Sequence, residues 1–168
     1  MKSSAINWST CFAMCSFWLC SLFGCAGISK NPNGMMGASD IDVYIGGSVI
    51  VEGSHFPSAG YWKNGKWTTL CTAHSEVTRL VVSGNDVYAC GFYLKDWELG
   101  AAGYWKNSKW IELPSAGPEF NCVAKDIAVA GSDVYVVGFR DDGKNSNYGY
   151  WRNGTWTALN PLYLMIIR

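Results

Sequence analysis

The side chains that could take part in acid–base chemistry are few and form no recognisable set. The chain contains two histidines, His55 and His74, and each lies in a connection between predicted strands. Nucleophilic catalysis of the triad type needs a nucleophile, a base and an orienting acid in contact. Neither histidine has a candidate nucleophile at a recognisable spacing. The sequence therefore predicts no catalytic residues, and we expect a protein that is not an enzyme.

Neighbouring carboxylates suggest metal binding at one place only. Asp141 and Asp142 lie in an Arg-Asp-Asp-Gly-Lys-Asn segment that superficially suggests a calcium loop. An EF-hand loop requires acids at alternating positions and a terminal glutamate, and both are absent. We interpret the segment as a solvated hairpin turn between the second and third strands of a repeat. The sequence predicts no metal site and no cofactor.

Three aspartates recur in an Asp-Val-Tyr motif, at Asp42, Asp86 and Asp133. Each follows a predicted tight turn, where a carboxylate can accept hydrogen bonds from nearby backbone N–H groups. A catalytic site normally interrupts a repeat rather than recurring in it. We therefore expect these aspartates to have a structural role.

The tryptophan side chains are the other candidates for ligand binding. Six of the nine tryptophans form pairs inside a repeated motif, where they either fill the space between sheets or stack on a sugar. Trp97 belongs to no repeat and lies between charged residues in a predicted connection. It is the candidate for an exposed ligand contact.

The cysteines do not form a framework. Of the seven in the chain, Cys71, Cys90 and Cys122 follow Cys25, and their number and spacing match no metal motif. We expect Cys90, inside a predicted strand, to behave as a small buried apolar residue. Cys71 and Cys122 lie in successive connections between predicted blades, and the sequence does not decide whether a disulfide joins them.

A repeated sequence motif predicts the strands that position these residues. The motif Gly-Tyr-Trp-Lys/Arg-Asn-Gly/Ser-x-Trp starts at Gly60, Gly103 and Gly149, so that the starts are 43 and 46 residues apart. Such a period is typical of stacked or radial repeats, most often β-propellers with one repeat per blade. Asn64-Gly65 is a strong hairpin signal, which predicts that the two tryptophans of each motif face one another across the hairpin.

Each repeat predicts four short antiparallel strands. In the Asp-Val-Tyr segments β-branched and aromatic residues alternate and glycine ends the run, as in strands. Gly84-Asn85 and Gly131-Ser132 join the second and third of these segments to preceding strands through two-residue turns. The first strand of the first repeat is expected at residues 36–39. Leu70, Leu113 and Leu159 close the fourth strands.

The expected fold is all-β. It is an incomplete β-propeller-like array of about three four-stranded antiparallel blades, over residues 40–72, 73–115 and 116–160, after an N-terminal signal helix. Propellers usually close with four to eight blades, and open sheet edges invite pairing with other chains. A truncated chain, an open array or an oligomer closed through these edges all remain open. The apolar segment 161–168 favours truncation, or else it returns to cover the first blade.

The N-terminus has its own signature. Residues 5–24 lack charge and are rich in apolar residues, which is typical of an export segment. Leu22-Phe23-Gly24-Cys25 resembles the lipobox of bacterial lipoproteins. The resemblance implies a signal peptide over 1–24, a diacyl group on the Cys25 sulfur, a tether over 25–39, and placement at the outer membrane. An ordinary signal peptide or a transmembrane helix is the alternative.

Composition excludes some partners. Lysine and arginine number 13, as do aspartate and glutamate, and removal of Lys2 with the signal peptide leaves one more acid than base. This balance gives no electrostatic reason to bind nucleic acid or an anionic membrane surface.

The repeats resemble the Tyr-Trp-Lys-Asn-Gly repeats of bacterial propeller-like lipoproteins, over residues 40 to about 160. The resemblance implies a cell-envelope lipoprotein that acts as a non-catalytic binding or scaffolding module for a glycan or protein ligand. Its membrane contact is the lipid anchor on Cys25. The alternatives are a fragment of an envelope propeller hydrolase whose active-site blades are missing, and a non-functional truncated remnant.

Overall fold

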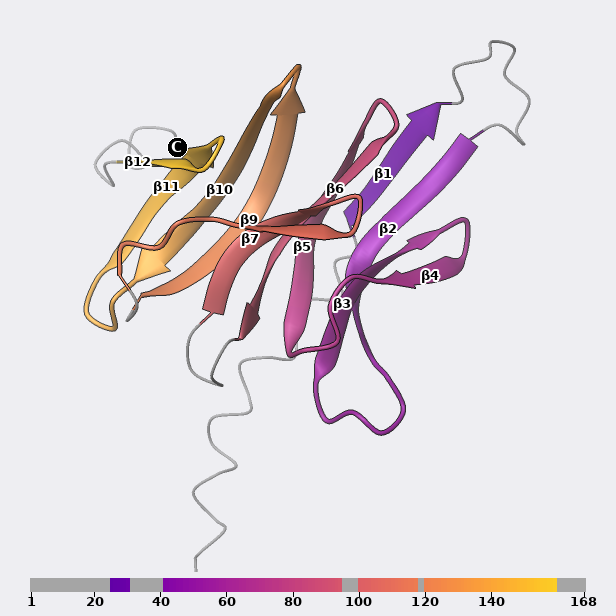
Figure 1. Cartoon of the computed structure of the whole chain (residues 1–168), viewed down its shortest axis with the longest axis horizontal. Coiled ribbons are helices and arrows are strands. Elements are labelled where there is room, and N and C mark those ends of the chain that lie inside the picture. Colours follow the sequence, from indigo (N-terminus) through magenta and orange to yellow (C-terminus); the bar gives the residue numbers. More distant parts are fainter. Residues whose placement is uncertain (1–24, 31–40, 95–99, 118–119, 160–168) are drawn as a thin grey trace, which may run out of the picture.

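The computed structural model describes residues 25–30, 41–94, 100–117 and 120–159. These residues form twelve strands and no helix, arranged as three four-stranded antiparallel sheets in chain order (Figure 1). The first sheet contains β1 (Cys25–Lys30), β2 (Ile41–Ile50), β3 (Pro57–Lys63) and β4 (Lys66–Thr69). The second contains β5 (Ser75–Ser83), β6 (Asp86–Leu94), β7 (Gly100–Lys106) and β8 (Lys109–Glu112). The third contains β9 (Asn121–Ala130), β10 (Asp133–Asp141), β11 (Ser146–Arg152) and β12 (Thr155–Ala158).

The prediction of an all-β chain built from four-stranded units is thereby confirmed. The two-residue turns are found where the sequence indicates them, since Ser83 pairs with Asp86 and Ala130 pairs with Asp133. The expected signal helix over 1–24 and the apolar segment 161–168 lie outside the described residues.

The first strand of the first sheet differs from the expectation. A tether over 25–39 and a strand at 36–39 are expected from the sequence, but the strand that pairs with β2 is β1, with Ile28 opposite Val43. Residues 36–39 lie outside the described residues. Local pattern cannot reveal this pairing, because residues 31–40, which begin with Asn-Pro-Asn-Gly, replace the two-residue turn of the other sheets.

The two signature motifs of each repeat meet across the second and third strands. In the second sheet, the Asn107 side chain accepts a hydrogen bond from the Val87 backbone N–H (2.9 Å) and donates one to the Asp86 carboxylate (2.6 Å). The Asn107 backbone N–H donates to the Val87 carbonyl (2.9 Å), and Lys106 forms an ion pair with Asp86 (3.0 Å). The first and third sheets repeat this network, with Arg152 in place of the lysine in the third. We call it the asparagine clamp.

The clamp gives the recurring aspartates a structural role, but through partners that differ from the expected ones. Instead of nearby backbone N–H groups, Asp86 accepts hydrogen bonds from Asn107 and Lys106, about twenty residues away in the chain. These two bonds lower the pKa of Asp86. The aspartates therefore fasten the hairpin turn of the motif to the strand beside it.

Asparagine suits this position because its backbone is left-handed. Asn64, Asn107 and Asn153 have φ of 49°, 48° and 48°, a region that asparagine adopts more readily than most residues. The next turn residue also has positive φ, as in type I′ hairpin turns. It is glycine in the first and third sheets, but Ser108, with φ of 69°, in the second.

The same hairpin holds two tryptophan rings together. Trp105 lies opposite Trp110 with ring centroids 4.4 Å apart, and the pairs of the first and third sheets are separated by 4.3 and 4.4 Å. The predicted register is confirmed. The Trp110 ring covers Gly103, where a Cβ atom would lie 2.4 Å from the ring. The motif needs glycine there because any side chain would displace the tryptophan.

Strand alternation separates the recurring aromatic residues of each repeat onto two faces. The Trp face carries the tryptophan pair and the second-strand residues beside it: Val43, Ile45, Trp62 and Trp67 in the first sheet, Val87, Ala89, Trp105 and Trp110 in the second, and Val134, Val136, Trp151 and Trp156 in the third. The Tyr face is opposite: Tyr44, Gly46, Ala59 and Tyr61; Tyr88, Cys90, Ala102 and Tyr104; Tyr135, Val137, Tyr148 and Tyr150.

The sheets pack through unlike faces. One apolar cluster joins the Tyr face of the first sheet to the Trp face of the second, and includes Tyr44, Ala59, Leu80, Ala89 and Trp105. The other joins the Tyr face of the second sheet to the Trp face of the third, and includes Tyr88, Cys90, Ala102, Val136 and Trp151. Both internal interfaces therefore have the same polarity.

Side chains near the starts of β5 and β9 form hydrogen bonds between neighbouring sheets. The Ser75 hydroxyl accepts a hydrogen bond from the Ala59 N–H (2.9 Å), and the Asn121 side-chain oxygen accepts one from the Gly100 N–H (2.9 Å). The Thr78 hydroxyl donates to the Ala124 carbonyl (2.8 Å). These bonds fix each sheet against the preceding one.

We predict that the clamp contributes measurably to stability. Asn107→Gly keeps the left-handed backbone but removes both side-chain hydrogen bonds, and we expect the free energy of unfolding to fall by about 1–2 kcal/mol. Denaturant unfolding of the full chain measures it. Ser108→Gly at the adjacent turn position is the matched control. It should raise stability by about 0.5–1 kcal/mol, because glycine relieves the positive φ. Equal stability of Asn107→Gly and wild type would contradict the clamp.

The glycine of the tryptophan hairpin gives a second prediction. Gly103→Ala places a Cβ atom 2.4 Å from the Trp110 ring and 2.6 Å from the Ile111 carbonyl oxygen. We expect a loss of about 1–3 kcal/mol, as in other overpacked sites. Gly47→Ala is the control, because its nearest contact is 3.4 Å. If the two variants melt at the same temperature, the close approach is not required.

Candidate functional site

Both histidines contact one phenylalanine ring. His74 stacks on Phe56 with ring centroids 5.3 Å apart, and His55 meets the same phenylalanine edge-on at 6.4 Å. This aromatic group lies at the connections that precede β3 and β5. It contributes to packing of those connections.

The paired aspartates form the turn that the sequence predicts, between β10 and β11. The Asp142 carboxylate accepts hydrogen bonds from the N–H groups of Lys144 (2.9 Å) and Asn145 (2.7 Å), which lower its pKa. Asp141 accepts one from the Gly143 N–H (2.7 Å). In the described residues, no group of three or more His, Cys, Asp and Glu side chains could hold a metal ion.

No disulfide joins Cys71, Cys90 and Cys122 to one another. Cys71 packs against the cluster between the first and second sheets, whereas Cys122 belongs to the cluster between the second and third. The disulfide left open by the sequence is therefore not formed. Cys90 is fully buried, as predicted, and burial raises the pKa of its thiol to about 12.

Two of the repeat tryptophans are packing residues. Trp105 and Trp151 are 2% and 0% exposed inside the two interfaces between sheets. Their rings are therefore unavailable to a sugar. The candidate contact Trp97 lies outside the described residues, and Cys25 is described only as the backbone at the start of β1.

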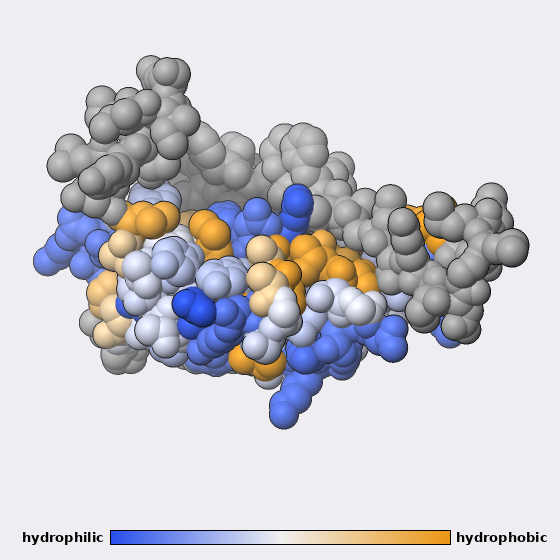
Figure 2. Space-filling view, turned by 90° about the horizontal axis from the view of Figure 1, so that it is seen from above, coloured by the Kyte–Doolittle hydropathy of each residue, from blue (hydrophilic) through white to orange (hydrophobic). Residues whose placement is uncertain are grey.

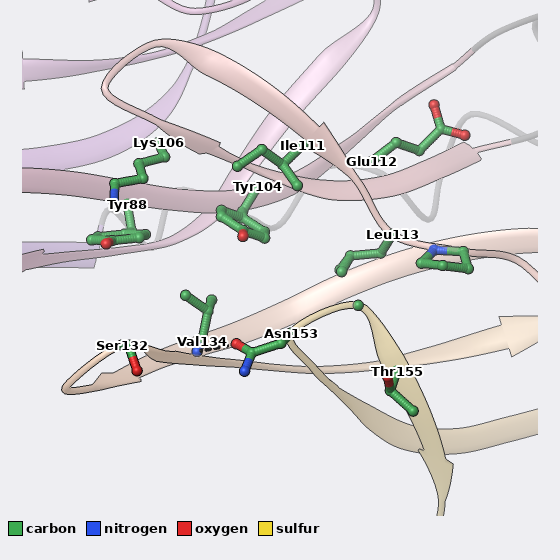
Figure 3. A pocket seen from close by; sticks show the side chains of 12 residues that line it. Tyr88, Tyr104, Lys106, Ile111, Glu112, Leu113, Ser132, Val134, Asn153 and Thr155 are labelled. Atoms are coloured by element: carbon green, nitrogen blue, oxygen red, sulfur yellow. Dashed lines mark hydrogen bonds between the residues drawn. The ribbon is translucent and has the colours of Figure 1, made fainter.

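A cleft of about 600 Å³ lies between the second and third sheets. Its lining combines aromatic, charged, hydroxyl and apolar groups, and Figure 3 labels most of them. The lining residues are Tyr88, Tyr104, Lys106, Ile111, Glu112, Leu113, Pro114, Ser132, Val134, Asn153, Gly154 and Thr155.

One wall of the cleft is the Tyr face of the second sheet. The Tyr88 and Tyr104 rings lie side by side, with centroids 6.3 Å apart (Figure 3). The Lys106 ammonium lies 5.2 Å from the Tyr88 ring centroid and pairs with Asp86, so its charge is balanced locally. Partial burial raises the pKa of Tyr104, and a tyrosine hydroxyl can both donate and accept a hydrogen bond.

The opposite wall is the clamped hairpin of the third sheet. Asn153 is held by its bonds to the Val134 N–H (2.9 Å) and the Asp133 carboxylate (2.7 Å). Thr155 follows it in β12, and Ser132 belongs to the neighbouring turn. Hydroxyl and amide groups thus face the tyrosine rings across the cleft (Figure 3).

The end of the cleft is fixed by one backbone carbonyl. Pro114, in the connection between the second and third sheets, accepts hydrogen bonds from the Trp151 indole N–H (3.0 Å) and from Arg140 (3.0 Å). The Arg140 guanidinium stacks over the Trp156 ring at 4.3 Å. The cleft is therefore built between rigid elements.

Such a lining can bind a ligand through ring stacking and neutral hydrogen bonds. The sequence does not lead to the prediction of these residues when only the tryptophans, and not the tyrosines, are considered as ligand contacts. The signal was available: the tyrosines of the Asp-Val-Tyr and Gly-Tyr-Trp motifs recur together in every repeat. Their ring pairs lie 6.0, 6.3 and 6.5 Å apart in the three sheets.

The surface seen from above is mixed, with apolar side chains in a few small patches among polar ones (Figure 2). None of the residues that the structure describes belongs to a helix with the length and hydropathy of a membrane span. Neither the models of known protein families nor the curated proteins include a match to this chain.

Proposed function

We propose that this protein is a non-catalytic glycan-binding module of the bacterial cell envelope. In this proposal the three sheets are blades of an incomplete propeller-like array, and a lipid on Cys25 attaches the array to the outer membrane. The repeat period and the stacking of four-stranded sheets in chain order support the array. The apolar segment ending in Leu22-Phe23-Gly24-Cys25 supports export and lipidation.

The observation that carries the proposal is the cleft between the second and third sheets. Sugars present flat C–H faces and a rim of hydroxyl groups. The half-buried Tyr104 ring offers an apolar surface with a polar tip and is backed by the buried Tyr88 ring, and Ser132, Asn153 and Thr155 offer neutral hydrogen-bonding groups opposite. A volume of about 600 Å³ is within the range of small-ligand sites and accommodates a short oligosaccharide.

Charge also favours a neutral ligand. Lys106, the cation among the lining residues, pairs with Asp86 and lies against Tyr88, so it is already satisfied within the sheet. The Glu112 carboxylate points away from the tyrosine rings and accepts a hydrogen bond from the Tyr93 hydroxyl (3.5 Å), so it adds no free charge to the cleft (Figure 3). The protein gains nothing from a phosphorylated or strongly acidic ligand at this site.

We predict that Tyr104→Leu weakens glycan binding about tenfold or more, because loss of a stacked ring costs about 1.5 kcal/mol. The measurement is isothermal titration of the full chain with soluble peptidoglycan fragments and with chitotetraose. Lys106→Met should also weaken binding, because the Lys106 ammonium lies against the Tyr88 ring at the wall of the cleft. Lys63→Met is its matched control, because Lys63 makes the same ion pair and ring contact in the first sheet but does not line this cleft.

Equal effects of the two lysine variants would mean that the clamp, and not the cleft, accounts for the loss. No heat and no competition with either probe would overturn the glycan assignment at this cleft. Thermal melting of each variant separates lost binding from lost folding.

The anchor has its own prediction. In a bacterial envelope fraction, we expect the mature chain to begin at Cys25 and to be heavier than its amino-acid mass by the acyl groups. Cys25→Ser should stay unprocessed and unacylated, because the modification needs the thiol. Intact-protein mass spectrometry measures both. A mature chain that is cut elsewhere and has no added mass would remove the anchor from the proposal, and the cleft would be unaffected.

A further inference from the structure

The end sheets expose the two faces that meet inside the molecule. Each internal interface joins the Tyr face of one sheet to the Trp face of the next. The first sheet has no sheet before it and the third has none after it among the described residues. The first and third sheets lie at opposite ends of the stack (Figure 1), so the register of their strands gives one end a Trp face and the other a Tyr face.

The Trp face of the first sheet is uncovered. Ile45 is 39% exposed, while the equivalent residues Ala89 and Val136 are 1% exposed. Val43 is 40% exposed, against 8% for the equivalent Val134. The difference is not one of residue type, because apolar residues occupy these positions in all three sheets.

The Tyr face of the third sheet is uncovered in the same way. Tyr148 is 51% exposed, whereas the equivalent Ala59 and Ala102 are fully buried. Leu159, just after the fourth strand of this sheet, is 46% exposed, whereas the equivalent Leu113 is 3% exposed. An apolar surface of this kind on both ends of one molecule marks an interaction site.

Residue sizes at the internal interface show how a small residue on the Tyr face accepts a large one. Gly46, on the Tyr face of the first sheet, lies so close to the first strand of the second that a Cβ atom would be 3.2 Å from the Leu80 Cβ atom. Cys90, which is equivalent to Gly46, shares its cluster with Ile127, which is equivalent to Leu80. Small and large residues face one another at both interfaces.

At the two ends of the stack the Tyr face carries the larger residue and the Trp face carries the smaller one. Val137 occupies the position of Gly46 and Cys90 on the third sheet. In β1, Ala26 is in register with Ile45, the place that Leu80 and Ile127 hold in the other sheets. A larger residue on the Tyr face is thus matched by a smaller one on the strand that would meet it.

We propose that the Trp face of the first sheet docks on the Tyr face of the third sheet of a second copy of this chain. The contact repeats, between molecules, the interface that occurs twice within one. It joins different surfaces of two copies, so such contacts generate closed rings or open chains. Two copies closed in this way contain six sheets, which falls within the four to eight blades of closed propellers. The inference does not depend on the ligand or on the lipid.

The test uses one variant on each face. Ile45→Asp places a charge on the Trp face, and Val137→Asp places one on the Tyr face. Both residues are exposed in the single chain, so folding is preserved, which thermal melting of each variant checks. Native mass spectrometry of the full chain should give twice the chain mass for wild type. Each variant alone should give the single mass, because every interface in a homodimer then contains one damaged face.

Mixing the two variants decides the orientation. An equimolar mixture of Ile45→Asp and Val137→Asp should recover dimers, because one of the two contacts then joins two intact faces. Ile50→Asp, at a 70% exposed position of the same strand β2, should stay dimeric and serves as the control. A monomeric wild type overturns the proposal. A wild-type dimer that persists in both variants also overturns it. So does a dimer that only one of the two variants dissociates and that does not re-form when the variants are mixed.

Discussion

The arrangement of this protein depends on an asparagine held in a left-handed turn. In each sheet its side chain joins two strands that are about twenty residues apart in sequence, through the backbone of a valine and the carboxylate of the preceding aspartate. A one-residue slip of a strand would transfer every side chain to the other face. By fixing the turn against the neighbouring strand, the clamp sets the register and so decides which face receives tryptophans and which receives tyrosines.

Faces of different chemistry give the stack a direction. The tryptophan pair needs the glycine beneath it, and the resulting flat aromatic surface is covered by the preceding sheet, as the 2% and 0% exposure of Trp105 and Trp151 shows. The tyrosines face the next sheet, but the clamped hairpin of that sheet stops short of closing over them. The cleft lined by Tyr88, Tyr104 and Asn153 arises there. The proposed ligand site is thus a by-product of the same register that builds the core.

The same polarity explains why the ends of the stack matter. Apolar side chains at positions that are buried inside the array are 39–51% exposed at its two ends. Exposure of this kind lowers stability relative to a covered face, at about 25 cal/mol for each Å² of apolar surface. In the proposed dimer, a second copy of the chain supplies the complementary surface with the residues it already has. Binding in the cleft and docking through the ends use different residues and can operate together.

The sequence by itself determined the local units: four antiparallel strands per repeat, the Trp62–Trp67 pairing across an Asn-Gly turn, the Asp141–Asp142 turn and the burial of Cys90. Each of these depends on residues close in the chain, where spacing and turn chemistry are sufficient. Only the tertiary structure decided the rest. β1 pairs with β2 across residues 31–40, Asn107 and Lys106 reach Asp86 on the neighbouring strand about twenty residues away in the chain, and Tyr88 and Tyr104 meet the turn of another sheet. Those contacts join residues that are distant in sequence, and local pattern contains no information on which distant surfaces meet.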